Sequence, residues 1–322
     1  MSLRLLPLLV TIATFVLGAI LCSLQFPHFA STRVFTNLLT DNAFLGIVAV
    51  GMTFVILSGG IDLSVGSVIA FTCVLLAILI ERDHVPPFVA FAIALSVAGL
   101  FGAAMGALIH VFRLPPFIVT LAGMFFARGM CFVLTTDSIP IGAPLYAQLY
   151  RHAIDLPGHG KLSVIAIIML LVVAAGMVIA HRTRFGTNVY ALGGNRVSAE
   201  LMGVKVGRTT IAIYTLSSTL AGLAGIVFSF YTGAGSSLAA TGVELDTIAA
   251  VVIGGTLLSG GVGTVFGTFV GVLIQGLIQT YITFDGSLSS WWTKIAIGAL
   301  LFGFIVMQRV LVAVAGRRGS LA

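Results

Sequence analysis

Very few residues of this sequence could take part in chemistry within its long apolar stretches, and four of them stand in two similar short segments. Asp62 and Ser64 end the segment Gly-Gly-Ile-Asp-Leu-Ser, and Glu244 and Asp246 lie in Gly-Val-Glu-Leu-Asp. Each segment comes directly before an apolar stretch. Asp and Ser there can cap the first free amides of a helix, and acids at a span boundary can also shape a gate or line a polar path. Both roles stay open, because a cap at a helix break also fixes the break.

The motifs of nucleotide, metal and hydrolytic chemistry are absent from the sequence. G-x-x-x-x-G-K-[ST], which cradles ATP phosphates, does not occur, and neither do H-E-x-x-H and G-x-S-x-G. The 6 histidines are scattered, and the 3 cysteines stand inside apolar runs. We therefore expect no catalytic residue, no metal site and no bound cofactor, so energy for any active process would have to come from elsewhere. An intramembrane enzyme is disfavoured for the same reason.

The composition is that of a membrane protein. Of the 322 residues, 59% are hydrophobic and 8% are charged, whereas a soluble domain carries about 25% charged residues. No single water-soluble core could hide this much apolar surface. A soluble enzyme, a nucleic-acid-binding protein and a disordered chain are thereby excluded, and membrane lipid is an expected partner. The formal charge of +6 then indicates membrane orientation rather than affinity for nucleic acid.

These residues stand beside long apolar stretches, and a helix that crosses about 30 Å of hydrocarbon needs roughly 20 residues. We expect an all-α polytopic protein, residues 1–322 forming one transmembrane domain of about ten helices. The predicted spans are 5–25, 36–57, 64–80, 87–110, 116–135, 162–181, 209–231, 246–258, 264–283 and 291–310, of which the eighth is short. The first is interpreted as a retained helix rather than a signal peptide, because its apolar run is long for a signal core.

Orientation follows from the basic residues in the loops, which are more frequent on the cytoplasmic side. Ten spans place both termini on one side together with Arg4, Arg113, Arg182, Arg184, Arg196, Lys205, Arg208, Arg309, Arg317 and Arg318; the other side holds Arg33, Arg82, Arg151 and Lys161. This bias predicts cytoplasmic termini. It also predicts that the proline-containing loop 136–161 lies outside and is irregular. The basic loop 182–208 is expected in the cytoplasm, with a short helix near 198–202.

Two glycine patterns and a repeat concern the packing of the spans. Gly102 and Gly106 share one helical face, and so do Gly263, Gly267 and Gly271; spacing of this kind lets membrane helices approach closely. The two acidic segments precede spans that run in opposite directions across the membrane. That arrangement is typical of inverted repeats, whose interface often holds the substrate path.

The sequence resembles the permeases of ribose-type sugar ABC importers in four places. The matching stretches are SGGIDLSVGS at 58–67, PPFIVTL at 115–121, ELDTIAAVVIGG at 244–255 with LSGG at 258–261, and the loop from 185 to 204. Together they cover nearly the whole chain in order. Within this family the chain looks like one of the two permeases of a galactofuranose importer. Thr187 departs from the family, in which Arg is common at this position.

The resemblance implies a subunit that works with a second permease, cytoplasmic ABC ATPases and a periplasmic sugar-binding protein in the bacterial inner membrane. It identifies the loop 182–208 as the ATPase-coupling loop, with Gly193, Gly194, Asn195, Arg196, Glu200 and Gly203 as its candidate residues. The resulting hypothesis is an ATP-driven importer of galactofuranose or a related pentose or hexose. The alternative is a secondary transporter driven by an ion gradient, which the near absence of acids in the middle of spans disfavours.

Overall fold

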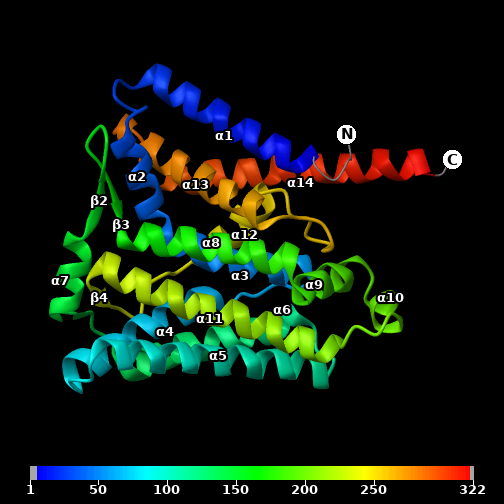
Figure 1. Ribbon diagram of the computed structural model, residues 1–322, viewed down its shortest axis with the longest axis horizontal. Helices are drawn as coiled ribbons and strands as arrows, with labels where there is room; N and C mark the ends of the chain where they lie inside the picture. Colours follow the sequence, from blue (N-terminus) through cyan, green and yellow to red (C-terminus); the bar gives the residue numbers. More distant parts are fainter. Residues whose placement is uncertain (1–5, 320–322) are drawn as a thin grey trace.

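The computed structural model describes residues 6–319, which form a bundle of helices and two small sheets (Figure 1). The helices are α1 (Leu6–Gln25), α2 (Thr32–Asp41), α3 (Ala43–Leu57), α4 (Val65–Ala77) with a π-helical turn (Ile78–Arg82), α5 (Pro87–Val111), α6 (Pro116–Leu134), α7 (Pro144–Arg151), α8 (Val164–Arg182), α9 (Arg184–Gly194), α10 (Arg196–Leu201), α11 (Val206–Thr232), α12 (Val243–Ile253), α13 (Val265–Asp285) and α14 (Trp291–Gly319). The strands are β1 (Ile139–Pro140), β2 (Ala153–Leu156), β3 (Gly160–Ser163) and β4 (Ala234–Gly235).

The expectation of a helical polytopic protein is confirmed. Within the described residues, 8 helices are long and apolar enough to cross a membrane, and there are up to 9 spans if α2 and α3, which bend by 56° at Asn42, count as one. The predicted eighth span is α12, which has only 11 residues. A helix of that length covers about 16 Å, roughly half the hydrocarbon thickness.

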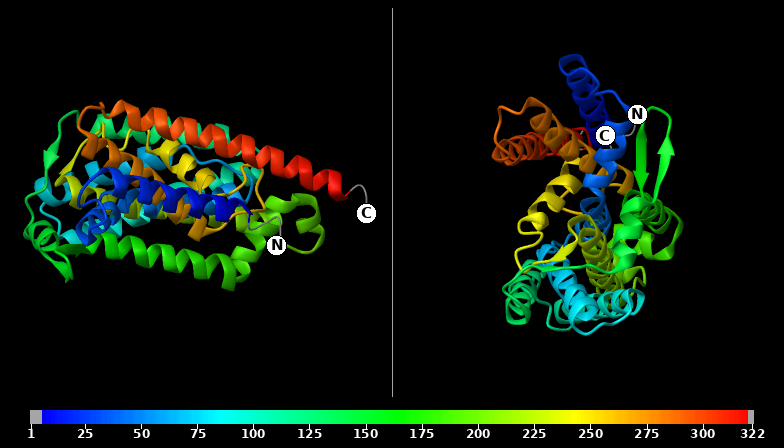
Figure 2. Two further views of the ribbon diagram at one scale, coloured as in Figure 1. Left: turned by 90° about the horizontal axis from the view of Figure 1, so that it is seen from above. Right: turned by 90° about the vertical axis from the view of Figure 1, so that its left-hand side faces the viewer.

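The long helices run side by side along the molecule, and its two ends differ (Figures 1 and 2). One end holds α9 and α10, together with the first turn of α1 and the last turn of α14. The opposite end holds α7 and the hairpin of β2 and β3. The predicted loops 182–208 and 136–161 therefore lie at opposite ends, which is the arrangement that the basic residues required.

Loop 136–161 is ordered, contrary to the irregular structure expected from its prolines. Pro144 begins α7, where a missing amide hydrogen is harmless because the first amides of a helix have no partner in it. Tyr146 of α7 shares a 3.0 Å hydrogen bond with Ser229 of α11. Burial raises the pKa of Tyr146 to about 12, so this hydroxyl keeps its proton and holds α7 on the bundle.

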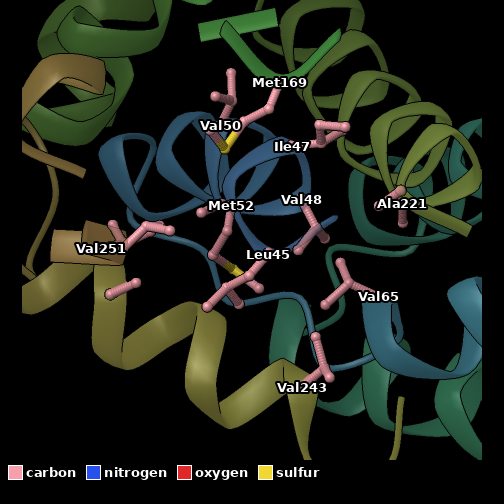
Figure 3. Packing of buried hydrophobic residues seen from close by; sticks show 14 of the residues in the cluster. Leu45, Ile47, Val48, Val50, Met52, Val65, Met169, Ala221, Val243 and Val251 are labelled. Atoms are coloured by element: carbon pink, nitrogen blue, oxygen red, sulfur yellow. The ribbon is translucent and has the colours of Figure 1, made fainter. Parts of the chain in front are cut away.

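Helix α3 is the centre of the bundle. Fourteen of its 15 residues are buried, as expected for a helix that is apolar on every side. It packs against α11, α8, α12 and α13, and Figure 3 shows Met169 and Val251 beside it from two of these neighbours. Because α3 is enclosed by protein, its C-terminal end is fixed by contacts with other loops rather than by lipid.

The two glycine faces lie against neighbouring backbones. A Cβ atom at Gly102 would collide with Tyr214 of α11, and one at Gly106 would lie 2.8 Å from the Cα of Ile211. On α13, Gly267 faces the carbonyl of Gly254 and Gly271 faces that of Ala250. Gly263, just before α13, faces Thr256 and has φ +152°. These glycines thus set the spacing of α5 against α11, and of α13 against α12.

Candidate functional site

The chain between α3 and α4 is non-helical, and Asp62 is fully buried within it. One carboxylate oxygen, Oδ1, accepts hydrogen bonds from the amide of Ser64 at 2.9 Å and from its hydroxyl at 2.6 Å. The other, Oδ2, accepts from the hydroxyl of Ser217 on α11 at 2.8 Å. Asp62 therefore fixes the break and ties it to α11. It does not cap α4, whose N-cap position is Ser64 without a side-chain cap bond.

Tyr214 stands one turn before Ser217 on α11, outside this hydrogen-bond network. Its hydroxyl is buried and has no hydrogen-bond partner among the described residues. A Cβ atom at Gly60 would collide with that hydroxyl. The interruption after α3 therefore packs directly on Tyr214, and Gly60 provides the space.

The two acidic segments meet inside the bundle. A Cβ atom at Gly66, in the first turn of α4, would collide with Oε2 of Glu244, in the first turn of α12. That oxygen is buried and has no hydrogen-bond partner within the described part of the chain. From this meeting point α4 runs toward the end with α7, since Glu81 accepts a 2.7 Å hydrogen bond from the amide of Gly142. Helix α12 runs toward the end with α9. Two helix N-termini, each carrying partial positive charge, thus face each other around a carboxylate.

Arg128 lies within α6 and stabilises the chain that leads into α12. Its Nη1 donates to the carbonyls of Ser237 and Ala239 at 2.7 and 2.8 Å. These carbonyls belong to the non-helical chain between β4 and α12, where irregular backbone at membrane depth needs such partners. No local pattern in the sequence indicates these bonds, because the two carbonyls stand 109 and 111 residues away along the chain.

Asp246 is bound by a cation from another helix. Nζ of Lys294 on α14 lies 2.6 Å from both carboxylate oxygens, and the backbone carbonyl of Asp246 accepts a 2.9 Å bond from Gln275 of α13. Three helices therefore converge on the first turn of α12. Asp246 and Lys294 carry opposite charges and lie in two different predicted spans, 246–258 and 291–310. Each span considered alone does not indicate that the two residues pair.

The loop 182–208 forms two short helices, one more than expected. The side chain of Asn195 caps α10 by accepting a 2.9 Å bond from the amide of Ser198, and Gly203 ends the turn after it with φ +85°. Arg196 and Glu200 are exposed. Beside them, Val197 is 68% exposed, Leu201 84% and Met202 72%. Helix α10 thus presents an apolar tip with charged neighbours at the end of the molecule.

A junction of glycines joins this loop to the core. The amide of Gly261 donates a 2.9 Å hydrogen bond to the carbonyl of Leu57, the last residue of α3. A Cβ atom at Gly193, near the end of α9, would collide with that same carbonyl. A Cβ atom at Gly260, whose φ is +85°, would lie 3.0 Å from the Cα of Gly193. The backbones of α9 and of the turn after α12 therefore both touch the end of α3.

Aromatic contacts support the junction. The hydroxyl of Tyr190 on α9 donates to the carbonyl of Gly263 at 2.8 Å, and the ring of Phe185 lies 5.8 Å from that of Phe54 on α3. A displacement of α9 would therefore change contacts both with α3 and at the start of α13. In residues 6–319, no group of three His, Cys, Asp or Glu side chains could hold a metal ion.

Comparison with known proteins decides the class to which this arrangement belongs. Residues 34–305 match the family described as branched-chain amino acid transport system, permease component. The chain belongs to this permease family. It is a multi-pass permease component of an ABC transporter and has no catalytic role of its own, as the sequence indicated.

Several relatives are similar over nearly their whole length. The chain is 64% identical to the inner membrane ABC transporter permease protein YjfF of Escherichia coli, over 95% of this chain and 92% of that protein. It is 39% identical to the fructose import permease protein FruG of Bifidobacterium longum (97% and 93%) and 39% identical to the ribose import permease protein RbsC of Escherichia coli (88% and 88%). No solved structure matches the chain. The predicted inner-membrane location agrees with the first of these relatives.

Proposed function

We propose that the chain is the permease subunit of an ATP-driven sugar importer. In this proposal it forms a translocation pathway with a second permease and takes sugar from a periplasmic binding protein. The support for sugar, rather than the amino acid in the family's description, is the similarity to fructose and ribose import permeases over about nine-tenths of the chain. Galactofuranose, or a related pentose or hexose, is the proposed cargo, supported by the resemblance of the sequence motifs.

The observation that carries the proposal is the connection from an exposed docking tip to a buried helix break. Helix α10 exposes Leu201 and Met202, and α9 places Gly193 against the end of α3. A short exposed helix of this kind suits the cytoplasmic ATPase. Closure of the ATPase would push α9 against the junction and shift α3 relative to α11.

Asp62, Ser64, Glu244 and Asp246 are then proposed to lie at the gate. Asp62 ties the break to α11, and Glu244 faces the first turn of α4. A change in the relative position of these elements alters their hydrogen bonds. The outward-open and inward-open states then differ in interaction free energy, as a conformational change driven by a partner requires.

Co-purification of the tagged chain from bacterial membranes tests this assignment. We expect an ABC ATPase and a second permease to be retained. Leu201→Asp should release the ATPase and keep the second permease, because a charge at the docking tip opposes burial. Leu156→Asp, the same change on the hairpin at the opposite end, is the matched control and should keep both. Loss of the ATPase from both variants, or from neither, would contradict the proposed docking surface.

A further inference from the structure

A cavity of about 410 Å³, lined by both polar and apolar side chains, lies at the end of the bundle opposite α10. Its walls come from the turn between α2 and α3, the end of α11, the second half of α13 and the first turns of α12 and α14. Small-molecule sites fall in the range of about 300–1,000 Å³. The cavity reaches from the end that holds α7 to the first turn of α12, where Glu244 and Gly66 meet.

The hydrogen-bonding side chains that line the cavity range from exposed at its mouth to buried at its floor. Asp41 and Gln279 are exposed, whereas Asn42 is 7% and Gln275 3% exposed. Gln275 and Gln279 stand four residues apart on α13, so their side chains lie on one helical face. Asn42 uses its amide to donate to Leu38 and Gln275 donates to Asp246, which leaves their carbonyl oxygens as acceptors. Each amide group can both donate and accept, as recognition of hydroxyls requires.

Aromatic rings form the other wall. Phe44 and Phe228 lie with centroids 4.9 Å apart in an edge-to-face arrangement, and Tyr231 donates a 3.3 Å bond to Asp41. The lining therefore combines apolar ring carbon with amide groups. A monosaccharide has the same division, with C–H groups on one side and hydroxyls around its edge.

The charges of the cavity select against an anionic or zwitterionic cargo. Lys294 is the basic residue among the lining side chains, and it is bound to both oxygens of Asp246. No cation among the described lining residues is left to pair with a carboxylate or phosphate. An amino acid or a sugar phosphate would therefore be desolvated without a partner for its negative group, which is costly. A neutral ligand has no such requirement.

We propose that this cavity is the first sugar-binding site of the permease, with Gln279, Gln275 and Asp41 as specificity-determining hydroxyl ligands. The inference rests on the proposed function, since it names where the sugar of that importer is bound. The ion pair of Asp246 and Lys294 forms part of the floor, between this site and the gate at Glu244. Sugar released by the binding protein would enter at Gln279 and advance toward α12.

The test uses the complete importer in proteoliposomes with labelled galactose, ribose and fructose and with monodeoxy analogues of the sugar transported best. Gln279→Leu should reduce the uptake of that sugar about tenfold, the cost of one unmade hydrogen bond, and should raise KM more than it lowers Vmax. For the deoxy analogue that lacks the hydroxyl bound by Gln279, the variant and the wild type should take up the sugar at equal rates. The hydrogen bond removed by the substitution cannot form with that analogue in either protein. Ser96→Ala, at an exposed hydroxyl bound to its own helix, is the control and should match the wild type for every sugar.

A second measurement follows site occupancy without transport. In Gln279→Cys, a membrane-impermeant thiol reagent added outside should label the new thiol, and sugar-loaded binding protein should slow the labelling; the three native cysteines are buried. If the wild type imports sugar while Gln279→Leu behaves as Ser96→Ala for all analogues and Gln279→Cys is unprotected, the cavity is not the site. If lipid fills the cavity, the reagent will not label the thiol of Gln279→Cys, and this result too would show that the cavity is not the sugar site. If the wild type imports none of the sugars, the proposed function itself fails.

Discussion

The amide of Gly261 donates a 2.9 Å hydrogen bond to the carbonyl of Leu57, and Gly193 lies against the same carbonyl. The end of the most buried helix thus lies against two segments, the end of α9 in the proposed ATPase-docking region and the turn that follows α12. Contacts between backbones change little with side-chain motion, so this junction can transmit a push from α9 to α3.

The close contacts at the junction predict that alanine substitutions at Gly193 and Gly194 have different effects on transport. Gly193→Ala should reduce ATP-driven uptake at least tenfold, because its Cβ would meet the carbonyl of Leu57 and the amide of Gly261. Gly194→Ala is the matched control, since nothing lies within 4 Å of a Cβ there, and it should transport as the wild type. Uptake rates and the ATPase rate in the same preparation check this. Equal behaviour of the two variants would show that the close contact is not needed.

Asp62 should contribute strongly to the stability of the folded chain. Asp62→Ala leaves the hydroxyl of Ser217 and both donors of Ser64 without their acceptor, so it should lower the free energy of unfolding by about 3 kcal/mol. Ser217→Ala removes one bond and should cost about 1 kcal/mol. Thermal unfolding in detergent measures both. Asp137→Ala, at an exposed carboxylate, is the control; an Asp62→Ala variant as stable as this control would refute the role.

The ion pair of Asp246 and Lys294 should be detectable as a coupling. Lys294 is 53% exposed at its side chain, so a modest coupling of about 1 kcal/mol is expected. Asp246→Asn and Lys294→Met should each lower the unfolding temperature, and the double variant should lose less than the sum of the two. Additive effects in this double-mutant cycle would mean that the pair contributes nothing.

Asn195 should act through its cap on α10. Asn195→Ala removes the acceptor for the amide of Ser198, which should destabilise this short helix by about 1 kcal/mol and weaken coupling of ATP hydrolysis to uptake while membrane insertion is unchanged. Asn195→Ser keeps a capping oxygen and should restore coupling. The ratio of ATP hydrolysed to sugar imported is the measurement, and a failure of serine to rescue would indicate that Asn195 contacts the ATPase directly.

Hydropathy predicted the helical segments well because a membrane span is a local property of the chain. The short eighth stretch and the break at 58–64 were both visible as interruptions of apolar sequence. The bond from Ser217 to Asp62 and the bonds of Arg128 were not, because these partners stand 155 and 109 to 111 residues away and no local pattern specifies which helices meet. The proximity of Gly193 to Leu57 is likewise a consequence of the packed bundle.

The most direct test of the account compares energy sources for uptake. Proteoliposomes containing the chain with its second permease, the ATPase and the binding protein should import sugar when ATP is supplied, and Leu201→Asp should abolish this import. Proteoliposomes containing the chain alone should import none, whatever proton or sodium gradient is imposed. Accumulation of sugar by the isolated chain under such a gradient would contradict the account and identify a secondary transporter instead.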